Sequence, residues 1–304
     1  MELMEQYVKI VVFRMEDKDR KMAEKKVWLI TGAGSGIGYA LTEYLLKEGH
    51  CVSALTRNQA SLEDKLCSYG KEDSLLCTEV NLASDDSVKA AVAKTLDTFK
   101  RIDIVVNNAG YEKMGYIEEL DIEEIKEEFE INFYAPIRIM KLTLPIMRQQ
   151  GKGHYVNISS ICGTCYSYAG SVAYNTSKAA MDSLSKTLAS EVENMGIYAT
   201  SLICGQFRTN YFDSMQQSKT NLDAYENQRK QKMDSIFAMN HRQRGDVEKL
   251  CRVITGLSEM QTPPKELYVG MDAYSLGYNK ALNILANLKR WETFSRNMDF
   301  DEGE

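Results

Sequence analysis

Val27-Trp-Leu-Ile-Thr-Gly-Ala-Gly-Ser-Gly-Ile-Gly38 is the stretch that decides the fold. An apolar run leads into a glycine-rich turn, and residues 39–46 continue with the apolar spacing of a helix. Such a turn between a strand and a helix is typical of dinucleotide binding, because glycines let the backbone turn tightly and approach a pyrophosphate. The first N–H groups of the helix also attract phosphate. A glycine-rich string alone is a weak signal, so the rest of the chain has to support it.

Short apolar runs alternate with helix-period stretches along most of the chain. This alternation predicts an α/β fold of the Rossmann type, with a doubly wound, mostly parallel seven-stranded sheet and helices on both faces. The expected strands are 27–31, 51–56, 75–80, 102–107, 155–159, 198–203 and 267–270. The expected helices include 84–99, 122–133 and one that bends or restarts at Pro136 and runs to Gln150.

The domain organisation follows from where this alternation begins and breaks. Residues 22–304 are expected to form one catalytic domain. Residues 1–21 precede the alternation and indicate a loosely attached extension or an upstream start, although 8–13 could form an edge strand. The polar stretch 205–244 follows a strand end and is too long for a simple connection, so it is a candidate lid over a substrate. A closing C-terminal helix is expected, with Trp291 and Phe294 packing it onto the domain.

Composition excludes several classes of protein. The chain has 304 residues, 44% hydrophobic and 26% charged, with a net charge of −6. An acidic globule of this kind does not suit nucleic acid or an anionic membrane as its main partner. No apolar run approaches the roughly 20 residues that cross a bilayer. Acids near the start, where targeting peptides need bases, predict a cytoplasmic protein.

Cysteine and histidine give no sign of a metal site. The seven cysteines are irregularly spaced, which is typical of reduced thiols, and the three histidines lack ligand spacing. Cys162-Gly-Thr-Cys165 has the spacing of a redox motif without its usual context. We therefore expect no metal.

Tyr174-Asn-Thr-Ser-Lys178 indicates a tuned proton donor. A lysine four residues after a tyrosine lies on the same helix face, and its ammonium favours the phenolate. Lowering a tyrosine pKa from about 10 to about 7 requires roughly 4 kcal/mol, part of which a nicotinamide cation could supply. With 17 tyrosines this spacing arises about once by chance, so it proves little alone. Ser160, 14 residues before Tyr174 at the end of an apolar run, could donate a hydrogen bond to a developing oxyanion.

In combination these motifs resemble the short-chain dehydrogenase/reductase family, in its compact single-domain branch, over about residues 25–301. Residues 31–38 are similar to the family's Thr-Gly-x-x-x-Gly-x-Gly turn, and residues 107–110 match its Asn-Asn-Ala-Gly string. The resemblance implies that Ser160, Tyr174 and Lys178 are catalytic, with Ser160 preferred to Ser159 because Gly163 completes a Ser-x-x-Gly pattern. It also implies that Asn132 holds a water that relays protons from the lysine.

The resemblance further implies a nicotinamide cofactor. Asn108 should lie beside its ribose, while Asn107 and Gly110 brace the sheet. The expected second strand ends in Thr56 and Arg57 without the acid that would hold the ribose 2′-hydroxyl of NAD(H). A guanidinium there can grip a 2′-phosphate, so NADP(H) is preferred and NAD(H) remains possible. The expected cofactor contacts are Gly32, Ser35, Gly36, Ile37, Gly38, Arg57, Asn81, Leu82, Asn108, Gly110, Tyr174, Lys178, Gly205, Phe207 and Thr209.

Two positions depart from the family pattern. Cys204-Gly205 stands where the family has Pro-Gly, which frees the local φ angle but leaves a carbonyl available to the nicotinamide amide. Asn81 stands where aspartate is usual, and it can still hydrogen-bond near the adenine.

The sequence thus predicts an NADP(H)-dependent oxidoreductase that interconverts a carbonyl and an alcohol. Its partner is a small, partly apolar substrate, and the family implies a homo-oligomer, a dimer or a tetramer. The chain's ending resembles hydroxysteroid- and retinol-dehydrogenase-like reductases, without fixing the substrate. Aromatic residues of the candidate lid could line an apolar pocket, namely Phe207, Tyr211, Phe212 and Tyr225. The alternatives are a non-catalytic NADP(H)-binding sensor or scaffold, and a sugar-nucleotide epimerase or dehydratase, which the glycine spacing does not suit.

Overall fold

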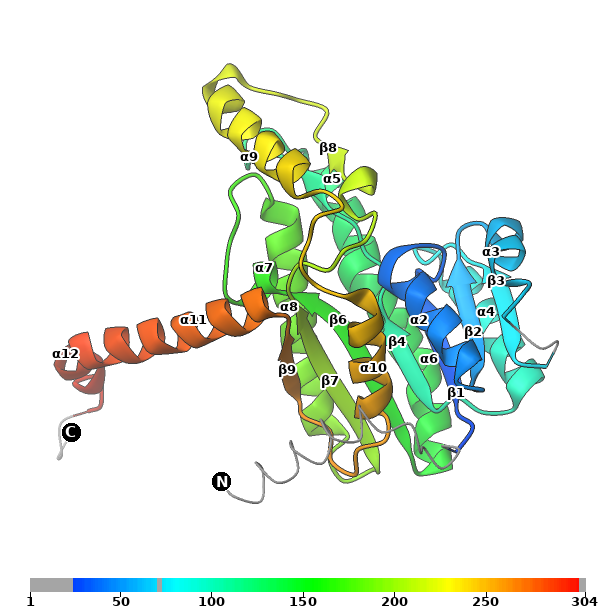
Figure 1. Cartoon of the computed structure of the whole chain (residues 1–304). Helices are drawn as coiled ribbons and strands as arrows, with labels where there is room; N and C mark the ends of the chain where they lie inside the picture. Colours follow the sequence, from blue (N-terminus) through cyan, green and yellow to red (C-terminus); the bar gives the residue numbers. More distant parts are fainter. Residues whose placement is uncertain (1–23, 70–72, 301–304) are drawn as a thin grey trace.

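The computed structural model describes residues 24–69 and 73–300, and within them a parallel sheet of seven strands forms the centre (Figure 1). Its spatial order, β3-β2-β1-β4-β6-β7-β9, confirms the predicted Rossmann-type fold. The order reverses between β1 and β4, and ligands of open α/β sheets bind at the carboxyl ends of strands flanking such a reversal. The strands are β1 (Val27–Thr31), β2 (Cys51–Thr56), β3 (Leu75–Glu79), β4 (Ile104–Asn107), β6 (Gly153–Ser160), β7 (Ile197–Cys204) and β9 (Glu266–Val269).

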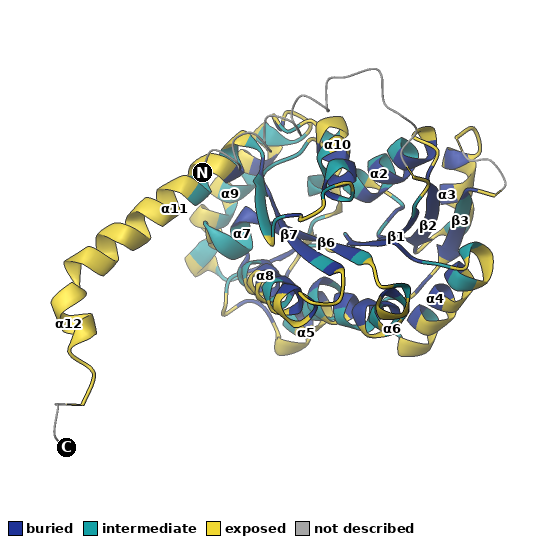
Figure 2. Cartoon of the chain, turned by 90° about the horizontal axis from the view of Figure 1, so that it is seen from below, coloured by how far each residue is buried: buried dark blue, intermediate teal, exposed yellow. Residues whose placement is uncertain are grey.

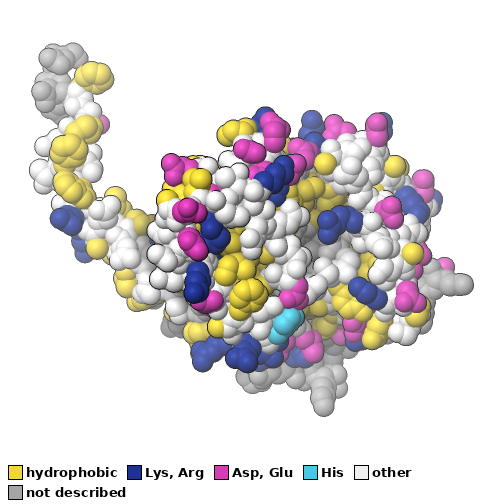
Figure 3. All heavy atoms as spheres, turned by 90° about the horizontal axis from the view of Figure 1, so that it is seen from above, with side chains coloured by type: hydrophobic (Ala, Val, Ile, Leu, Met, Phe, Trp, Pro, Cys, Tyr) yellow, Lys and Arg dark blue, Asp and Glu magenta, His cyan; other side chains and the backbone are white. Residues whose placement is uncertain are grey.

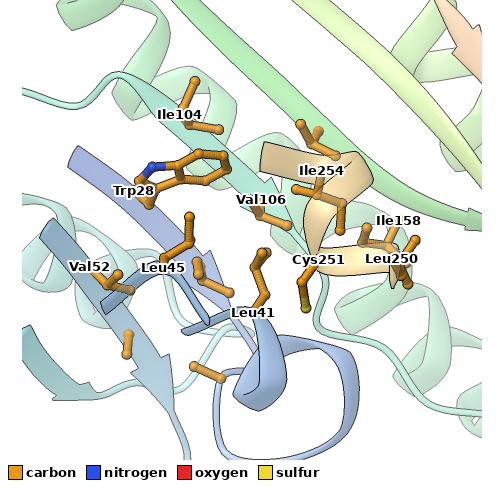
Figure 4. Close-up of a cluster of buried hydrophobic side chains, with 14 of the residues drawn as sticks. Trp28, Leu41, Leu45, Val52, Ile104, Val106, Ile158, Leu250, Cys251 and Ile254 are labelled. Atoms are coloured by element: carbon orange, nitrogen blue, oxygen red, sulfur yellow. The ribbon is translucent and has the colours of Figure 1, made fainter. Parts of the chain in front are cut away.

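Helices cover both faces of the sheet because neighbouring residues of each buried strand point to opposite sides (Figure 2). Trp28 and Ile30 pack beneath the helices of one layer, and Leu29 packs against the other layer. Figure 4 shows the first cluster, in which Trp28 meets side chains of α2 and α10. One layer holds α2 (Gly36–Lys47), α3 (Gln59–Leu66) and α10 (Val247–Leu257), and the other holds α4 (Asp85–Phe99), α6 (Ala135–Gln150) and α8 (Val172–Glu191).

The helix expected over residues 122–133 is interrupted. Helix α5 (Ile122–Phe129) passes into a π-helical turn, η1 (Glu130–Tyr134), before α6 begins at Ala135. Pro136 lies in the first turn of α6, which confirms the predicted restart. A π-helical turn inside a longer helix often marks a functional site, and this one carries Asn132.

The polar stretch 205–244 lies above the carboxyl ends of the strands (Figure 1). Its strand β8 (Gln216–Gln217) pairs with β5 (Lys113–Met114), and its helix α9 (Glu226–Met239) crosses over the domain. Several contacts fasten it to the loop before α5, among them an ion pair and a stack of two rings. Arg229 pairs with the buried Glu119, and the ring of Tyr225 stacks on Tyr116 with 4.2 Å between centroids.

The C-terminal helix differs from the expectation. Helix α11 (Met271–Arg290) forms, but it projects away from the domain, and Trp291 and Phe294 are 52% and 69% exposed (Figures 1 and 2). The expectation that these two aromatic residues pack a closing helix onto the domain is therefore wrong. Apolar spacing indicates that a helix face will be covered, but it does not say by what. The extension 1–21, with its possible edge strand 8–13, lies outside the described residues.

Candidate active site

The glycine-rich turn lies at the carboxyl end of β1. Gly32 and Gly36 have φ angles of +67° and +56°, a conformation that favours glycine. A Cβ on Gly34 would lie 2.7 Å from Thr56 Oγ1, and one on Gly38 would lie 2.4 Å from Gly32 O. Side chains at these positions would therefore fill the turn. Ser35 is the N-cap of α2, and its side chain makes no capping hydrogen bond. The first N–H groups of α2 are therefore free to bind an anion, and the residues of the turn fit a pyrophosphate.

Two neighbouring asparagines fix this turn against the sheet. Asn107 Nδ2 donates to Asn157 Oδ1 on β6 at 2.8 Å, as expected for a residue that braces the sheet. Asn108 Nδ2 donates to Thr31 O at 2.9 Å and to Gly32 O at 3.2 Å. The side chain of Asn108 thus braces the glycine turn itself, a role that the sequence assigned to its neighbours.

Ser160, Tyr174 and Lys178 come together where β6 ends beside α8. Ser160 and Tyr174 are both buried, and their hydroxyl groups lie close enough to interact. Lys178 Nζ lies 5.7 Å from the centroid of the Tyr174 ring and donates to Ile158 O at 2.9 Å. The spacing of four residues therefore places lysine and tyrosine on one buried helix face, as the sequence predicts.

The protonation of this pair differs from the expectation. Burial raises the pKa of Tyr174 well above its ordinary value of 10.0, and burial lowers the pKa of Lys178. Both shifts favour the neutral forms, since a buried charge loses its hydration. The sequence predicts a lowered pKa for Tyr174, whereas the groups of the chain itself raise it. In this setting Tyr174 holds its proton, as a proton donor must.

Asn132 joins the π-helical turn to the loop after β4. Its Oδ1 accepts from Tyr111 N at 3.0 Å, and its Nδ2 donates to Tyr111 O at 2.9 Å and to Ser177 Oγ at 3.1 Å. A Cβ on Gly110 would lie 3.0 Å from Asn132 Oδ1 and 3.3 Å from Lys178 Nζ. Only glycine lets these groups approach so closely. Asn132 therefore lies beside the lysine, and its own polar atoms position the backbone.

A buried carboxyl group, Glu128, backs this cluster. It accepts from Asn132 Nδ2 at 3.2 Å and from Lys113 N at 2.9 Å. Burial raises the pKa of Glu128 to about 8. No pattern in the sequence distinguishes Glu128 from the other acids of α5; what distinguishes it is its contact with Asn132 in the folded chain.

Tyr211 brings the polar stretch into direct contact with the proton donor. Its hydroxyl is hydrogen-bonded to that of Tyr174, with 6.0 Å between the ring centroids. It also donates to Glu112 Oε2 at 3.4 Å, and Glu112 accepts a hydrogen bond from Ser171 Oγ. Lys232 of α9 lies 3.4 Å from Glu112 Oε1 and donates to Ser171 Oγ. The sequence indicated Tyr211 as a pocket residue, but it did not indicate Glu112 or Lys232. The one signal for Glu112 is its position directly after the Asn-Asn-Ala-Gly-Tyr string. Nothing in the sequence indicates Lys232.

The loop after β7 is fixed by a residue that the sequence did not single out. Asp272 Oδ2 accepts from Gln206 N at 2.7 Å, and a Cβ on Gly205 would lie 1.9 Å from Asp272 Oδ1. This carboxylate orders the loop where the family's proline is missing. Beyond it, Phe207 packs against the core, and Thr209 lies within 4 Å of a Cβ built on Gly36.

The remaining predicted cofactor contacts lie around the glycine turn and the ends of β2 and β3. Arg57 is exposed at the end of β2, and Lys65 Nζ lies 3.5 Å from Gly34 O. Asn81 is exposed and its Oδ1 accepts from Ala83 N, which orders the turn after β3. Ile37 and Leu82 are half-buried and pack against the two core clusters.

The Cys-x-x-Cys motif lies in the short helix α7 (Ile161–Thr164) and its C-cap. Burial raises the pKa of Cys162 to about 11, so it is a poor thiolate. Across residues 24–69 and 73–300 no three His, Cys, Asp or Glu side chains gather as metal ligands, and no helix is long and apolar enough to cross a membrane.

Known proteins resemble this chain in sequence and in fold. The profile of the short chain dehydrogenase family matches residues 26–220. The chain belongs to this family. Among its relatives, Oxidoreductase BOA17 of Botryotinia fuckeliana is 31% identical over 275 residues, which cover 89% of this chain and 98% of that protein. An oxidoreductase of Schizosaccharomyces pombe is 32% identical over 252 residues, covering 82% and 83%. The expected class, an oxidoreductase of this family, is thereby confirmed.

Solved short-chain dehydrogenase structures superpose closely. The short-chain dehydrogenase from Streptomyces avermitilis has a TM-score of 0.81 and 33% identity, covering 91% of this chain and all of that one. The 3-ketoacyl-(acyl-carrier-protein) reductase from Brucella melitensis, solved in complex with NADH, has a TM-score of 0.68. It covers 81% of this chain and 96% of that one, and at 23% identity it supports the fold alone.

Proposed function

We propose that this short-chain dehydrogenase reduces a carbonyl to an alcohol, and runs the reverse reaction, with NADP(H). The observation that carries the proposal is the meeting of Ser160, Tyr174 and Lys178 at the end of β6, beside a glycine turn that fits a pyrophosphate. A protein that only binds the nucleotide, such as a sensor or scaffold, has no need for these three groups to converge.

Each side chain has a distinct part in this reaction. When bound, the nicotinamide supplies the hydride that reaches the carbonyl carbon. Tyr174 donates its proton to the carbonyl oxygen, and the hydroxyl of Ser160 donates a hydrogen bond to the same oxygen. Lys178 stabilises the phenolate that Tyr174 leaves behind, and Asn132 positions the loop and the lysine around it.

The preference for NADP(H) is supported by charge around the glycine turn. Arg57 is exposed at the end of β2, and Lys65 reaches toward Gly34. The last residue of β2 is Thr56, so no acid ends the strand to repel a 2′-phosphate. NAD(H) remains the less favoured cofactor. The other proposed contacts are Gly32, Ser35, Gly36, Ile37, Gly38, Asn81, Leu82, Asn108, Gly110, Tyr174, Lys178, Gly205, Phe207 and Thr209.

The proposed substrate is a small, partly apolar carbonyl compound held under the polar stretch 205–244. Tyr211 lies beside Tyr174, and Phe212 packs edge to face against Tyr211, so the two rings offer the substrate an aromatic wall. Tyr225 is engaged in its stack on Tyr116, so we assign it to holding the stretch in place. The proposed setting is the cytoplasm, in a homo-oligomer of one-domain subunits.

A screen of ketones and aldehydes with NADPH and NADH, followed by loss of the reduced nicotinamide's absorbance, tests this function. The expected result is alcohol formation from at least one apolar carbonyl, faster with NADPH. Tight NADPH binding without oxidation across a broad panel would point to the sensor instead. Binding of a nucleotide sugar, with no carbonyl reduced, would point to the epimerase class.

A further inference from the structure

The C-terminal residues 271–300 form an arm that consists mainly of α11 and the short helix α12 (Glu292–Arg296). Only Ala273 of α11 is buried, and every residue from Tyr278 to Phe300 is exposed. Figure 1 shows the arm leaving the domain, and Figure 3 shows apolar side chains along it. The exposed large apolar side chains of the arm are Met271, Tyr274, Tyr278, Leu282, Ile284, Leu285, Leu288, Trp291, Phe294, Met298 and Phe300.

The apolar side chains of α11 form a regular seam. Alternating steps of three and four residues define it, which is the heptad spacing of helices that pair lengthwise. Its members are Met271, Tyr274, Tyr278, Ala281, Leu285 and Leu288. A polar stripe with steps of four residues runs along another side of the helix, formed by Ser275, Asn279, Asn283 and Asn287. Helices in proteins owe most of their stability to packing of such an apolar face. Within the described ranges, no other part of the chain packs against the apolar face of the outer turns of α11.

We propose that the seam is covered by the same helix of a second copy of this chain, antiparallel about a two-fold axis. In an antiparallel pair, the first residue of the seam on one helix faces the last residue of the seam on the other helix. The resulting layers join Met271 with Leu288 of the partner subunit, Tyr274 with Leu285 of the partner subunit, and Tyr278 with Ala281 of the partner subunit. The layer nearest the axis therefore places the bulkiest side chain of the seam against the smallest.

The sizes of these side chains favour this arrangement over a parallel pair. In a parallel pair each residue meets its own copy, so Tyr278 crowds Tyr278 of the partner subunit. Ala281 would leave a void beside Ala281 of the partner subunit. Both faults destabilise a packed interface. An antiparallel pair also places the two domains at opposite ends of helices that are about 30 Å long.

The amount and chemistry of the exposed surface fit a second copy better than a membrane. A stable interface covers about 800 Å² of each partner, and the arm offers eleven large, exposed apolar side chains toward such an area. Helices that lie on membranes carry many Lys and Arg on their polar face. Here that face is mainly asparagine, and the whole chain has a net charge of −6. This interface is independent of the proposed chemistry.

The molar mass of the full chain in solution, measured by light scattering after size-exclusion chromatography, tests the pairing. The expected wild-type mass is an even multiple of 34.5 kDa. Leu285→Glu/Leu288→Glu should halve it, because charges in the seam cannot be buried unpaired. The matched control, Asn283→Glu/Asn287→Glu, adds the same charges to the polar stripe and should keep the mass. An unchanged mass in the seam variant overturns the proposal.

Disulfide trapping tests the direction of the pair. Tyr274 and Leu285 lie about 16 Å apart along their own helix, so cysteines there cannot join within one chain. Tyr274→Cys/Leu285→Cys should give a covalent dimer on oxidation, whereas Tyr274→Cys alone should not. Dimers from the single variant indicate a parallel pair and contradict the proposal. Flotation with vesicles of phosphatidylcholine and one-fifth phosphatidylserine tests a membrane as the partner. If the wild type floats, the seam variant does not, and the mass is the same in both, the arm binds a membrane instead.

Discussion

The phenol of Tyr174 carries the chemistry of the proposed site, and its surroundings decide its protonation. Burial raises the pKa of Tyr174 and lowers the pKa of Lys178, so the two side chains disfavour an ion pair. The neighbouring hydroxyl groups of Tyr211 and Ser160 act in the other direction and lower the pKa of Tyr174. Because burial is the largest cause, the phenol keeps its proton until a carbonyl oxygen accepts it.

The preference for NADP(H) over NAD(H) should depend on a single residue, Arg57. Arg57→Ala should raise the dissociation constant of NADPH about ten- to hundredfold, since a hydrogen bond to a charged group contributes about 1.5–3 kcal/mol. The dissociation constant of NADH, which lacks the 2′-phosphate, should change by less than about threefold. Calorimetric titration measures both, with the exposed Lys89→Ala on α4 as the control. An equal loss for both cofactors would show that Arg57 does not read the phosphate.

Residues of the site differ in how far the sequence could predict them. Tyr174 and Lys178 could be paired from their spacing alone, because a helix fixes the geometry of residues four apart. Tyr211 and Glu112 meet across 99 positions of the chain, and Asp272 reaches Gln206 across 66. No local periodicity encodes such contacts. These residues became visible only once the strands had placed their loops at one edge of the sheet.

At the scale of elements, helix α9 depends on a few polar contacts. Its hydrophobic content is low, and Ile236 is its only buried residue among those described. Lys232 donates to Gly170 O at 3.1 Å and to Ala169 O at 3.3 Å, besides its contacts with Glu112 and Ser171. One side chain thus ties α9 to the segment that begins α8, directly before Tyr174.

We expect removal of this tie to loosen α9. Lys232→Met should speed hydrogen exchange of the α9 amides about tenfold, because losing a charged hydrogen bond costs roughly 1.4 kcal/mol of local stability. The Michaelis constant for a carbonyl substrate should rise while kcat changes less. Mass spectrometry of exchanged peptides measures the first effect. The matched control is Lys230→Met, which removes an exposed lysine of the same helix. Equal exchange in both variants would contradict the anchoring role.

The apolar periodicity of the sequence predicts some of the helices and strands and not others. The seven strands of the central sheet follow from buried apolar runs, whereas their spatial order was not predicted and is seen only in the structure. The π-helical turn at Glu130–Tyr134 does not follow from the periodicity, because one extra residue in a helix leaves the apolar spacing almost unchanged. The direction of α11 was equally hidden, since an apolar stripe looks the same whether its own domain or another subunit covers it.

For the molecule as a whole, two buried titratable groups set opposite responses of stability to pH. His154 Nε2 lies 2.9 Å from Thr200 Oγ1 between β6 and β7, and burial lowers its pKa to about 3. The unfolded chain therefore binds this proton first, so His154 destabilises the fold as the pH falls below 6.5. Glu128, with its pKa raised to about 8, keeps its proton in the folded state. It destabilises the fold as the pH rises from 4.5 through 8.

The contribution of His154 can be isolated by comparison with a variant. Between pH 7 and pH 5 linkage should remove about 2 kcal/mol of unfolding free energy through His154. His154→Gln lacks this titration, so its unfolding free energy should fall by about that much less over the same interval. Urea unfolding at several pH values measures both proteins. His241→Gln, at an exposed position, should follow the wild type. Parallel pH profiles for His154→Gln and the wild type would refute the assignment.

The most direct test of the whole account separates cofactor binding from turnover in Tyr174→Phe. This change removes one hydroxyl and keeps the ring that packs beside Tyr211. We predict that kcat for carbonyl reduction falls about 1,000-fold, the scale of a lost general acid, while the dissociation constant of NADPH stays within about threefold. Turnover within about tenfold of the wild type would contradict the account, because the proton would then come from another group.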